Sequence, residues 1–300
     1  MEINGRRLGP GEPVYIAAEI AANHGGDLEL ALYQTLLAKD AGADAVKFQV
    51  RTFPESIPED QRDVMKSTPW GELSYLDYRK RLEFGKLQYE AIDAHCRSIG
   101  IDWFVSVWSE QAVDFMEQFD PICYKIGSPS LTDDVLLRRV AATERPVILS
   151  TGGSRQEQVA AASVTLASTN DLLVCQCTSS YPCDPAEVNL NYLAKLRLTY
   201  LDVGYSGHEL GTAISIAAVA LGAVYVERHF TSSHELWGSD QALSLEPQEF
   251  AEMVKGIREV EQALGDGIKR VYDSEQDSLK KLRRVNATRQ GIQEEAKAAH

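Results

Sequence analysis

The chain has 300 residues, 44% of them hydrophobic and 25% charged, a composition typical of a folded globular protein with a large core. Its 30 basic and 44 acidic side chains give a net charge of −14, which argues against nucleic acid or an acidic membrane surface as the partner. The five cysteines form no CxxC pair, and no signal segment or apolar run of the ~18 residues that a membrane helix needs is present, so we expect a cytoplasmic protein with reduced thiols.

The chain begins with a predicted hairpin and continues as a series of short β-rich segments. The stretch "INGRRLGPGEP" indicates a hairpin or plug with Asn4-Gly5 as its turn. Eight segments with strand-like composition follow, and helical patterns separate them. The expected strands cover residues 14–20, 44–50, 102–107, 123–127, 146–151, 172–177, 200–205 and 224–230.

The helical patterns alternate with these strands. Several of them end in glycine, where a residue without Cβ suits a left-handed cap. Strands that are apolar throughout and alternate with helices predict a parallel sheet, and eight such units in about 250 residues favour a (β/α)₈ TIM barrel over an open doubly wound sheet. We expect a barrel domain over 1–270 and a short helical tail over 271–300. The expected helices cover residues 27–42, 86–100, 109–119, 130–143, 154–168, 186–200, 209–222 and 246–265.

A long proline-bearing insertion, residues 51–84, follows the second expected strand. Loops that follow barrel strands build the face that carries the active site. The insertion is therefore a candidate lid or substrate wall, and a surface loop without function is the alternative.

Polar residues gather at the carboxyl ends of the expected strands. Two of them, Lys47 and Lys125, stand in otherwise apolar strands, and burying them is costly without an anionic partner. We therefore expect a bound phosphate or carboxylate to supply that partner. The strand ends carry Glu19, Asn23, His24, Lys47, Gln49, Ser106, Lys125, Ser128, Ser150, Thr151, Gln176, Thr178, Tyr181, Ser206, His208, Glu227 and His229.

Two histidines follow neighbouring strands, the seventh and the eighth. His208 and His229 could reach one point, and two neutral imidazoles with added oxygen ligands suit a divalent transition ion. Glu19, from the first strand beside the eighth, could complete the set. Two histidines that only donate or accept hydrogen bonds are the equally weighted alternative. Gly204 and Gly207 are expected to let the chain turn sharply off the seventh strand.

Seven stretches, in chain order, resemble the signatures of the sialic acid synthase family. Members of that family are TIM barrels that condense phosphoenolpyruvate with an open-chain aldose, giving a 3-deoxy-2-keto sugar acid and phosphate. The resemblance covers residues 14 to 265. The stretches are "AEIAANHGGDLELA", "GADAVKFQ", "YKIGSPSLTD", "ILSTGG", "CTSSYPCDPAEVNL", "VGYSGHELG" and "VERHFT...GSDQALSLEPQEF".

The resemblance implies a role for each matching position. The family's metal histidines fall on His208 and His229, which implies a divalent ion, manganese in the first place with magnesium or cobalt as alternatives. Glu19 and Asp240 match the acidic residues near the reacting atoms, so the implied catalytic residues are Glu19, Asp240, His208 and His229. The positions implied to bind substrate are Lys47, Gln49, Lys125, Ser128, Ser150, Tyr181 and Ser206.

The chemistry of the family explains these residue types. Phosphoenolpyruvate carries up to three negative charges, which lysines and hydroxyl groups would bind. The metal would polarise the sugar aldehyde toward attack by C3 of phosphoenolpyruvate, and water would then add at C2 as phosphate leaves. Glu19, Asp240 or water on the metal could carry the protons. A metal-dependent aldolase or isomerase on the same barrel, and a non-catalytic sugar-acid-binding homologue, are the alternative functions.

Several positions on the sugar side depart from the family pattern. Ser130 stands where glutamate is common, Ser179 replaces an asparagine, and Gln241 replaces a histidine. The stretch "STPF" after the third strand reads "SVWS", with Val107 and Trp108.

Family members also append an antifreeze-like domain that completes the partner's site in a homodimer. This sequence stops at His300, within the usual linker. We expect a homodimer without that domain, or a separate antifreeze-like chain.

Overall fold

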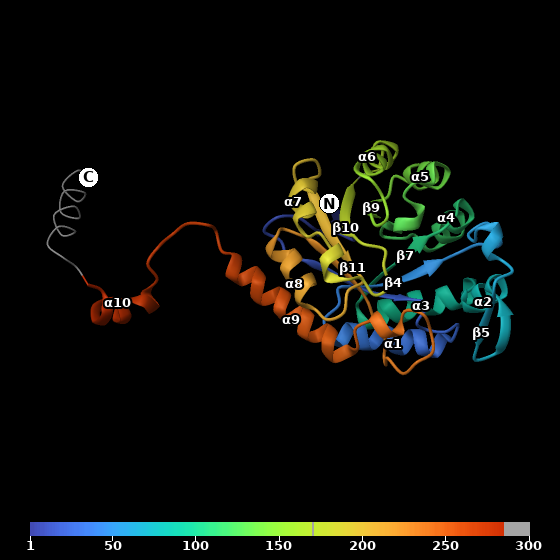
Figure 1. The fold of residues 1–300 in the computed structure, drawn as a ribbon, viewed down its shortest axis with the longest axis horizontal. Helices are drawn as coiled ribbons and strands as arrows, with labels where there is room; N and C mark the ends of the chain where they lie inside the picture. Colours follow the sequence, from blue (N-terminus) through green and yellow to red (C-terminus); the bar gives the residue numbers. More distant parts are fainter. Residues whose placement is uncertain (170, 285–300) are drawn as a thin grey trace. The chain divides into compact units, whose positions relative to one another are not determined.

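Eight parallel strands close into a barrel in this computed structural model, which describes residues 1–169 and 171–284 (Figure 1). Each strand pairs with the next one along the chain, and the last pairs with the first through Glu19 and His229, so the ring is closed. The predicted (β/α)₈ fold is confirmed. The strands are β3 Tyr15–Ala21, β4 Ala45–Val50, β7 Asp102–Val107, β8 Tyr124–Ile126, β9 Val147–Ser150, β10 Leu172–Cys177, β11 Asp202–Gly207 and β12 Tyr225–His229.

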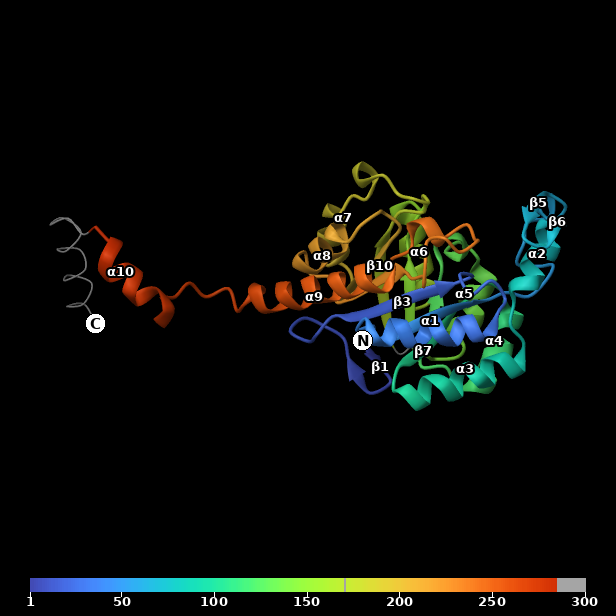
Figure 2. The same ribbon diagram turned by 90° about the horizontal axis from the view of Figure 1, so that it is seen from below.

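Helices surround the barrel in both ribbon views (Figures 1 and 2). Four expected glycine caps adopt positive φ angles, 92° at Gly42, 68° at Gly100, 97° at Gly222 and 59° at Gly265, as the left-handed cap requires. None of the described helices is both long and apolar enough to cross a membrane. The helices are α1 Leu28–Asp40, α3 Lys86–Ile99, α4 Glu110–Met116, α5 Asp134–Ala141, α6 Gln156–Thr165, α7 Asn191–Leu196, α8 Ala213–Ala220 and α9 Pro247–Leu264.

A second unit begins at Leu264, where the first unit, Met1–Ala263, ends. Within the second unit, α10 covers Gln276–Leu282. Of the expected tail, residues 271–300, the structure describes 271–284, and the rest lies outside the described residues.

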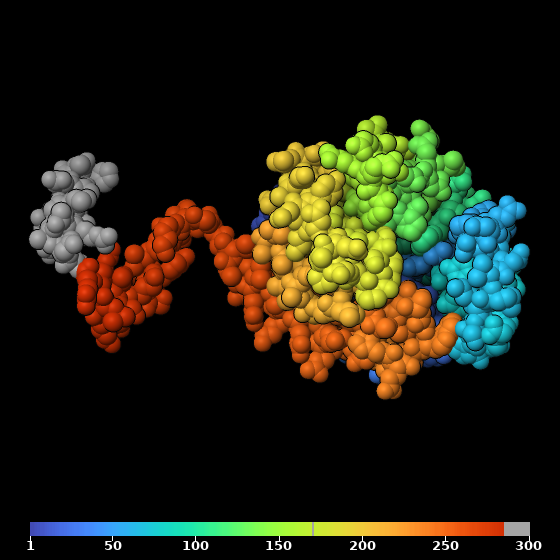
Figure 3. Space-filling view, viewed as in Figure 1, coloured from blue at the N-terminus to red at the C-terminus, as the bar shows by residue number. Residues whose placement is uncertain are grey.

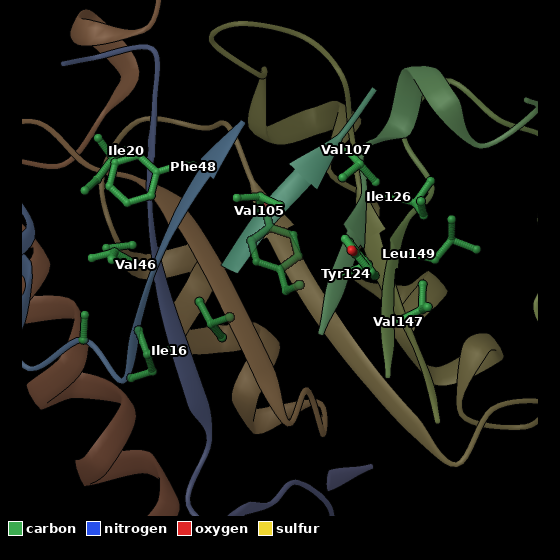
Figure 4. Close-up of a cluster of buried hydrophobic side chains, with 14 of the residues drawn as sticks. Ile16, Ile20, Val46, Phe48, Val105, Val107, Tyr124, Ile126, Val147 and Leu149 are labelled. Atoms are coloured by element: carbon green, nitrogen blue, oxygen red, sulfur yellow. The ribbon is translucent and has the colours of Figure 1, made fainter. Parts of the chain in front are cut away.

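Successive side chains of each strand point to opposite faces of the sheet, which produces two separate apolar clusters. Outward-facing residues such as Ile16, Val46 and Val105 pack against the helices (Figure 4). Inward-facing residues such as Tyr15 and Phe104 form the second cluster inside the barrel. Burial on both sides explains why the strand sequences are apolar throughout.

The N-terminal hairpin closes the barrel from the end opposite the polar strand termini. Its strands are β1 Glu2–Ile3 and β2 Arg6–Arg7, and the turn residues Asn4 and Gly5 have φ angles of 49° and 74°. Ile3 and Leu8 are buried in the inner apolar cluster. Both the predicted turn and the predicted plug are confirmed.

The insertion after β4 folds as a hairpin and a helix. The hairpin strands are β5 Met65–Thr68 and β6 Gly71–Ser74, and α2 covers Tyr75–Leu82. Trp237, from the loop after β12, packs edge-on against Trp70 and Tyr78, with ring centroids 5.8 and 5.5 Å away. The insertion is therefore packed against a loop at the carboxyl end of the barrel.

The seventh strand is longer at its carboxyl end than expected, because Gly204 and Gly207 lie within it instead of forming a turn. A Cβ on Gly204 would lie 2.8 Å from the Cys175 sulfur atom, and one on Gly207 would lie 2.5 Å from Oε2 of Glu209. Close approach of neighbouring groups, not a turn, requires glycine at both positions.

Candidate active site

Most of the polar residues at the strand ends line one small cavity inside the barrel, of about 70 Å³. The strand-end residues outside its lining are Asn23, His24, Thr151, Gln176 and Thr178. Strand register brings the lining residues together, since Glu19 lies opposite Lys47 on one side and His229 on the other. Of the predicted site residues only Asp240 is missing from its lining. The others all line it, namely Glu19, Lys47, Gln49, Lys125, Ser128, Ser150, Tyr181, Ser206, His208 and His229.

Two lysines and two carboxylates form a buried cluster in this cavity. Lys125 Nζ donates to Glu227 Oε2 at 2.8 Å, and Lys47 Nζ contacts the Glu19 carboxylate and lies 3.7 Å from Glu227 Oε1. The expectation that a bound anion must supply the partner of the lysines is therefore wrong, because the protein supplies it. Glu227 was among the strand-end residues but had no assigned role.

Glu227 holds the centre of the cluster. Besides the lysines, the Tyr225 hydroxyl donates to its Oε2 at 2.5 Å and the Ser206 hydroxyl to its Oε1 at 3.3 Å. Its position two residues before His229 on the same strand is the signal that it faces the barrel interior.

The cluster retains positive charge near neutral pH. Burial opposes ionisation of Glu227, but Lys125 and Lys47 outweigh it and hold the pKa of that carboxyl well below its usual range. Burial raises the pKa of Glu19 to about 7, although Lys47 acts in the opposite direction. Glu19 is therefore only partly ionised at neutral pH, and it can gain or lose a proton there.

The two histidines face each other at the cavity, with ring centroids 5.4 Å apart. His208 Nδ1 lies 2.8 Å from the carbonyl oxygen of Thr178, which can only accept, so Nδ1 carries the proton and Nε2 has a free lone pair. His229 Nδ1 is buried and has no hydrogen-bond partner among the described residues. Burial lowers the pKa of His229 to about 3, so its imidazole is neutral.

These properties fit a divalent transition ion. Burial lowers the pKa of His208, but the Cys177 side chain and the Thr178 carbonyl outweigh it and raise that pKa above its usual value, so an ion bound through Nε2 would displace any proton held there. Imidazole nitrogens are the ligands that such ions bind, and the orphaned buried nitrogen of His229 points to a missing partner. The described residues gather no group of three or more histidine, cysteine, aspartate or glutamate side chains that could hold a metal. Any ion held by His208 and His229 therefore has further coordination positions for oxygen atoms of water or substrate.

Tyr181 and Asp240 lie at the edge of this arrangement. The Tyr181 ring is 4.1 Å from the His208 ring between centroids, and the side chain is 52% exposed, so it covers the imidazole pair on the solvent side. Asp240 precedes the short helix Gln241–Leu243 and accepts a hydrogen bond from Ser239 Oγ at 2.7 Å. Its charge reaches His229, where it opposes the lowering of the pKa by burial.

A second cavity of about 960 Å³ adjoins the first. Trp108 lines both, and Arg51, which lines the larger one, donates to Oε1 of Gln49 in the smaller one at 3.4 Å. The insertion and the loop after β12 form its walls, and Figure 3 shows the hollow between the blue-to-cyan insertion and the yellow and orange loops. No role was predicted for Arg51 or Arg79, the two arginines that line this cavity, although the insertion was expected to be a lid or substrate wall.

The sequence of this chain is similar to that of known proteins. The family model described as the NeuB family matches residues 36–269. The chain belongs to the NeuB family. It is 36% identical over 283 residues to human N-acetylneuraminate-9-phosphate synthase, which covers 93% of this chain and 79% of the human protein. It is 37% identical over 266 residues to pseudaminic acid synthase of Campylobacter jejuni, covering 85% of this chain and 76% of that protein.

Solved structures agree with the NeuB assignment. N-acetylneuraminic acid (sialic acid) synthetase from Leptospira borgpetersenii superposes with a TM-score of 0.83 and 29% identity, over 95% of this chain and 98% of that chain. A 3-deoxy-D-arabino-heptulosonate 7-phosphate synthase from Thermotoga maritima, at 16% identity and a TM-score of 0.66 over 90% of this chain and 94% of that chain, shares the fold alone. The resemblance seen in the sequence is thus confirmed, and the chain is an enzyme of a family of sugar-acid synthases.

Proposed function

We propose that this NeuB-family enzyme condenses phosphoenolpyruvate with an open-chain aldose, such as an N-acetylmannosamine-like sugar, giving a 3-deoxy-2-keto sugar acid and phosphate. The observation that carries the proposal is the position of Lys47 and Lys125 in one cavity with His208 and His229. That combination offers charge for an anionic donor beside ligands for an electrophilic metal ion. The names of the relatives, which are synthases of sialic and pseudaminic acids, support the product class.

The lysine cluster suits the donor. Two ammonium groups against one fully ionised carboxylate and one partly ionised carboxylate leave positive charge for phosphate and carboxylate oxygens. Ser150 Oγ is buried without a hydrogen-bond partner among the described residues and can donate to such an oxygen. Ser128 Oγ accepts from the Gly152 N–H at 2.9 Å and donates to Cys177 Sγ at 3.5 Å. Sulfur is a weak acceptor, so the Ser128 hydroxyl can donate to a phosphate oxygen instead.

His208, through Nε2, and His229, through Nδ1, would hold the divalent ion, for which manganese is proposed and magnesium or cobalt are the alternatives. When bound, the ion would polarise the aldehyde oxygen of the acceptor.

The rest of the chemistry falls to the side chains of the cavity. C3 of phosphoenolpyruvate forms a bond to the aldehyde carbon, water adds at C2, and the C2–O bond to phosphate breaks. Glu19, with a pKa of about 7 and the ammonium group of Lys47 beside it, is the proposed carrier of the proton that water releases. Asp240, outside the cavity lining, is the second candidate.

Phosphate release tests the proposal. We expect release of inorganic phosphate from phosphoenolpyruvate with at least one aldose of a panel, and none after chelation of divalent metal. Lys125→Ala should abolish binding of phosphoenolpyruvate in calorimetry, whereas the exposed control Lys80→Ala should not. Absence of release with every aldose, with and without manganese, would contradict the proposal and leave the aldolase, isomerase and non-catalytic alternatives.

The remaining proposals concern organisation. We propose a cytoplasmic homodimer built on a barrel domain of 1–270, with a separate antifreeze-like chain as the alternative partner. Static light scattering of the purified chain tests the dimer, since a mass near 33.2 kDa would show a monomer.

A further inference from the structure

The larger cavity collects buried polar atoms that have no partner. Ten such side-chain atoms occur among the described residues, and four of them belong to residues that line this cavity: Nε of Arg51 and Arg79, Oγ of Ser56 and Nε1 of Trp108. All four can donate a hydrogen bond. Buried polar atoms in folded proteins nearly always have partners, so this concentration points to a ligand that supplies acceptors.

Arg79 is the decisive residue. It is only 7% exposed, although it lies on the short helix α2 of the insertion. Its neighbour Lys80 is exposed and lies 3.8 Å from Asp77, whereas Arg79 forms no ion pair with any carboxylate of residues 1–169 or 171–284. A guanidinium group cannot lose its charge by deprotonation, and a buried cation without a counter-ion is strongly unfavourable.

The carboxyl group of Glu83, which interacts with Arg79, does not balance this charge. Burial raises the pKa of Glu83 to about 7, although the Arg51 N–H, Arg79 and the Arg51 side chain all act in the opposite direction. Its Oε2 already accepts from the backbone N–H of Arg51 at 3.1 Å. Glu83 is thus only partly ionised at neutral pH, while two buried guanidinium groups face the same cavity.

The residues that line this cavity carry a net positive charge, whereas the chain as a whole is negative. Arg51, Lys66 and Arg79 line the cavity against a single carboxylate, that of Glu235, in a chain with a net charge of −14. Four aromatic residues complete the walls, and aromatic faces with a few fixed polar groups are typical of small-molecule sites of this size. The aromatic residues are Tyr75, Tyr78, Trp108 and Trp237.

We propose that this cavity is the acceptor subsite and that Arg79, with Arg51 and Lys66, binds a phosphate or carboxylate group at the far end of the acceptor aldose. The proposal rests on the function proposed above. Trp108 lines both cavities, so an acceptor whose aldehyde end lies in the smaller cavity can keep its charged end in the larger one. The guanidinium fork binds two oxygens of either group at once.

Acceptor preference tests the subsite. The panel should contain a neutral hexose or N-acetylhexosamine, its 6-phosphate and the corresponding hexuronic acid. We expect kcat/KM for one of the anionic sugars to exceed that for the neutral one by about 10- to 150-fold, the range for hydrogen bonds to charged groups. Whether the 6-phosphate or the uronic acid is preferred identifies the anion.

Variants assign the preference to the cavity. Arg79→Gln should bring the ratio of anionic to neutral kcat/KM close to one, mainly through a higher KM for the anionic sugar. Arg81→Gln is the matched control on the same helix, since Arg81 does not line this cavity, and should keep the ratio. If Arg79→Gln does not fold, Lys66→Gln at an exposed position should still lower the ratio at least threefold.

Two results would overturn the subsite: equal use of neutral and anionic acceptors by the unaltered protein, or a ratio that neither Arg79→Gln nor Lys66→Gln changes. Calorimetric titration of the hexose 6-phosphate and the hexuronic acid without phosphoenolpyruvate separates this inference from the proposed function. Binding that depends on Arg79 would support the subsite even if no aldose releases phosphate, and absence of such binding would contradict it whatever the outcome for turnover.

Discussion

Glu227 is the carboxylate whose replacement perturbs the buried cluster most. Glu227→Gln keeps the size of the side chain and one acceptor oxygen, for either the Tyr225 or the Ser206 hydroxyl, but removes the charge that faces Lys125 at 2.8 Å and Lys47 at 3.7 Å. Removal of one partner from a buried ion pair costs about 3 to 5 kcal/mol, because the remaining charge stays buried. Two ammonium groups share this carboxylate, so we expect the upper part of that range.

Urea unfolding followed by circular dichroism measures this loss. In a domain of this size about 1 kcal/mol corresponds to roughly 2 to 4 °C, so the Tm in thermal unfolding should fall by about 8 to 20 °C. Glu117→Gln is the control, since Glu117 pairs with Arg145 at 2.9 Å at a partly exposed site, where a pair contributes about 0 to 1 kcal/mol.

The pH dependence gives a second, independent readout. Because its pKa is lowered in the folded protein, Glu227 contributes stability above the ordinary glutamate pKa of 4.5, and loses it as the pH falls further. The difference between the unaltered protein and Glu227→Gln should therefore shrink below pH 4.5. A loss at neutral pH no larger than that of Glu117→Gln would refute the charge balance inferred for the cluster.

Three further predictions concern the metal ligands, the insertion and the seventh strand. His208→Ala and His229→Ala should each weaken manganese binding at least 100-fold, measured by calorimetry or by the spin resonance of free manganese. Glu83→Gln should flatten the stability profile between pH 4.5 and 7: the raised pKa of Glu83 makes the unaltered protein lose up to about 3 kcal/mol as the pH rises through that window, at about 1.4 kcal/mol per pKa unit. Gly207→Ala should lower the Tm by several degrees, because its Cβ would lie 2.5 Å from Oε2 of the buried Glu209.

Matched variants distinguish these effects from general damage. His95→Ala, outside the lining of both cavities, should leave manganese binding unchanged. Gly9→Ala should be tolerated better than Gly207→Ala, since its Cβ would have no neighbour closer than 3.5 Å. Undiminished manganese binding in both His208→Ala and His229→Ala would return these residues to a hydrogen-bonding role.

The sequence was sufficient to predict the barrel, because burial on both faces leaves strands that are apolar throughout and easily recognised. It was misleading at the seventh strand, where Gly204 and Gly207 suggested a turn. Their lack of Cβ instead makes room for Cys175, which lies on the neighbouring strand, and for the side chain of Glu209, which turns back toward Gly207.

The same distinction applies to the site. The alternation of side chains along the strands and the closure of the barrel were enough to predict that Lys47 and Lys125 lie in one place. The alternation follows from the local sequence pattern, and the closure follows from the number of strands. The pairing of both with Glu227 depends on side-chain geometry across the barrel. The walls of the larger cavity include Tyr78 and Trp237, which pack together although they come from distant parts of the chain. Neither contact leaves a periodic signal in the sequence.

The positions that depart from the family signatures gain meaning from the two cavities. Lys47, Lys125, His208 and His229, which keep the signatures, all line the smaller cavity. Among the departures, Trp108 lines both cavities and stacks under the Arg51 guanidinium group, whose Cζ atom lies 3.4 Å from its ring centroid.

Gln241, another departure, is buried elsewhere and donates to the carbonyl oxygen of Asn23 at 3.2 Å, so it stabilises the loops and contacts neither cavity. The smaller and the larger cavity are thus built mainly from different segments, barrel strands for the first and the insertion with the loop after β12 for the second. A change at Arg79, which lines the larger cavity and not the smaller one, can therefore alter the larger cavity without touching the lysine cluster, whereas Trp108 lines both.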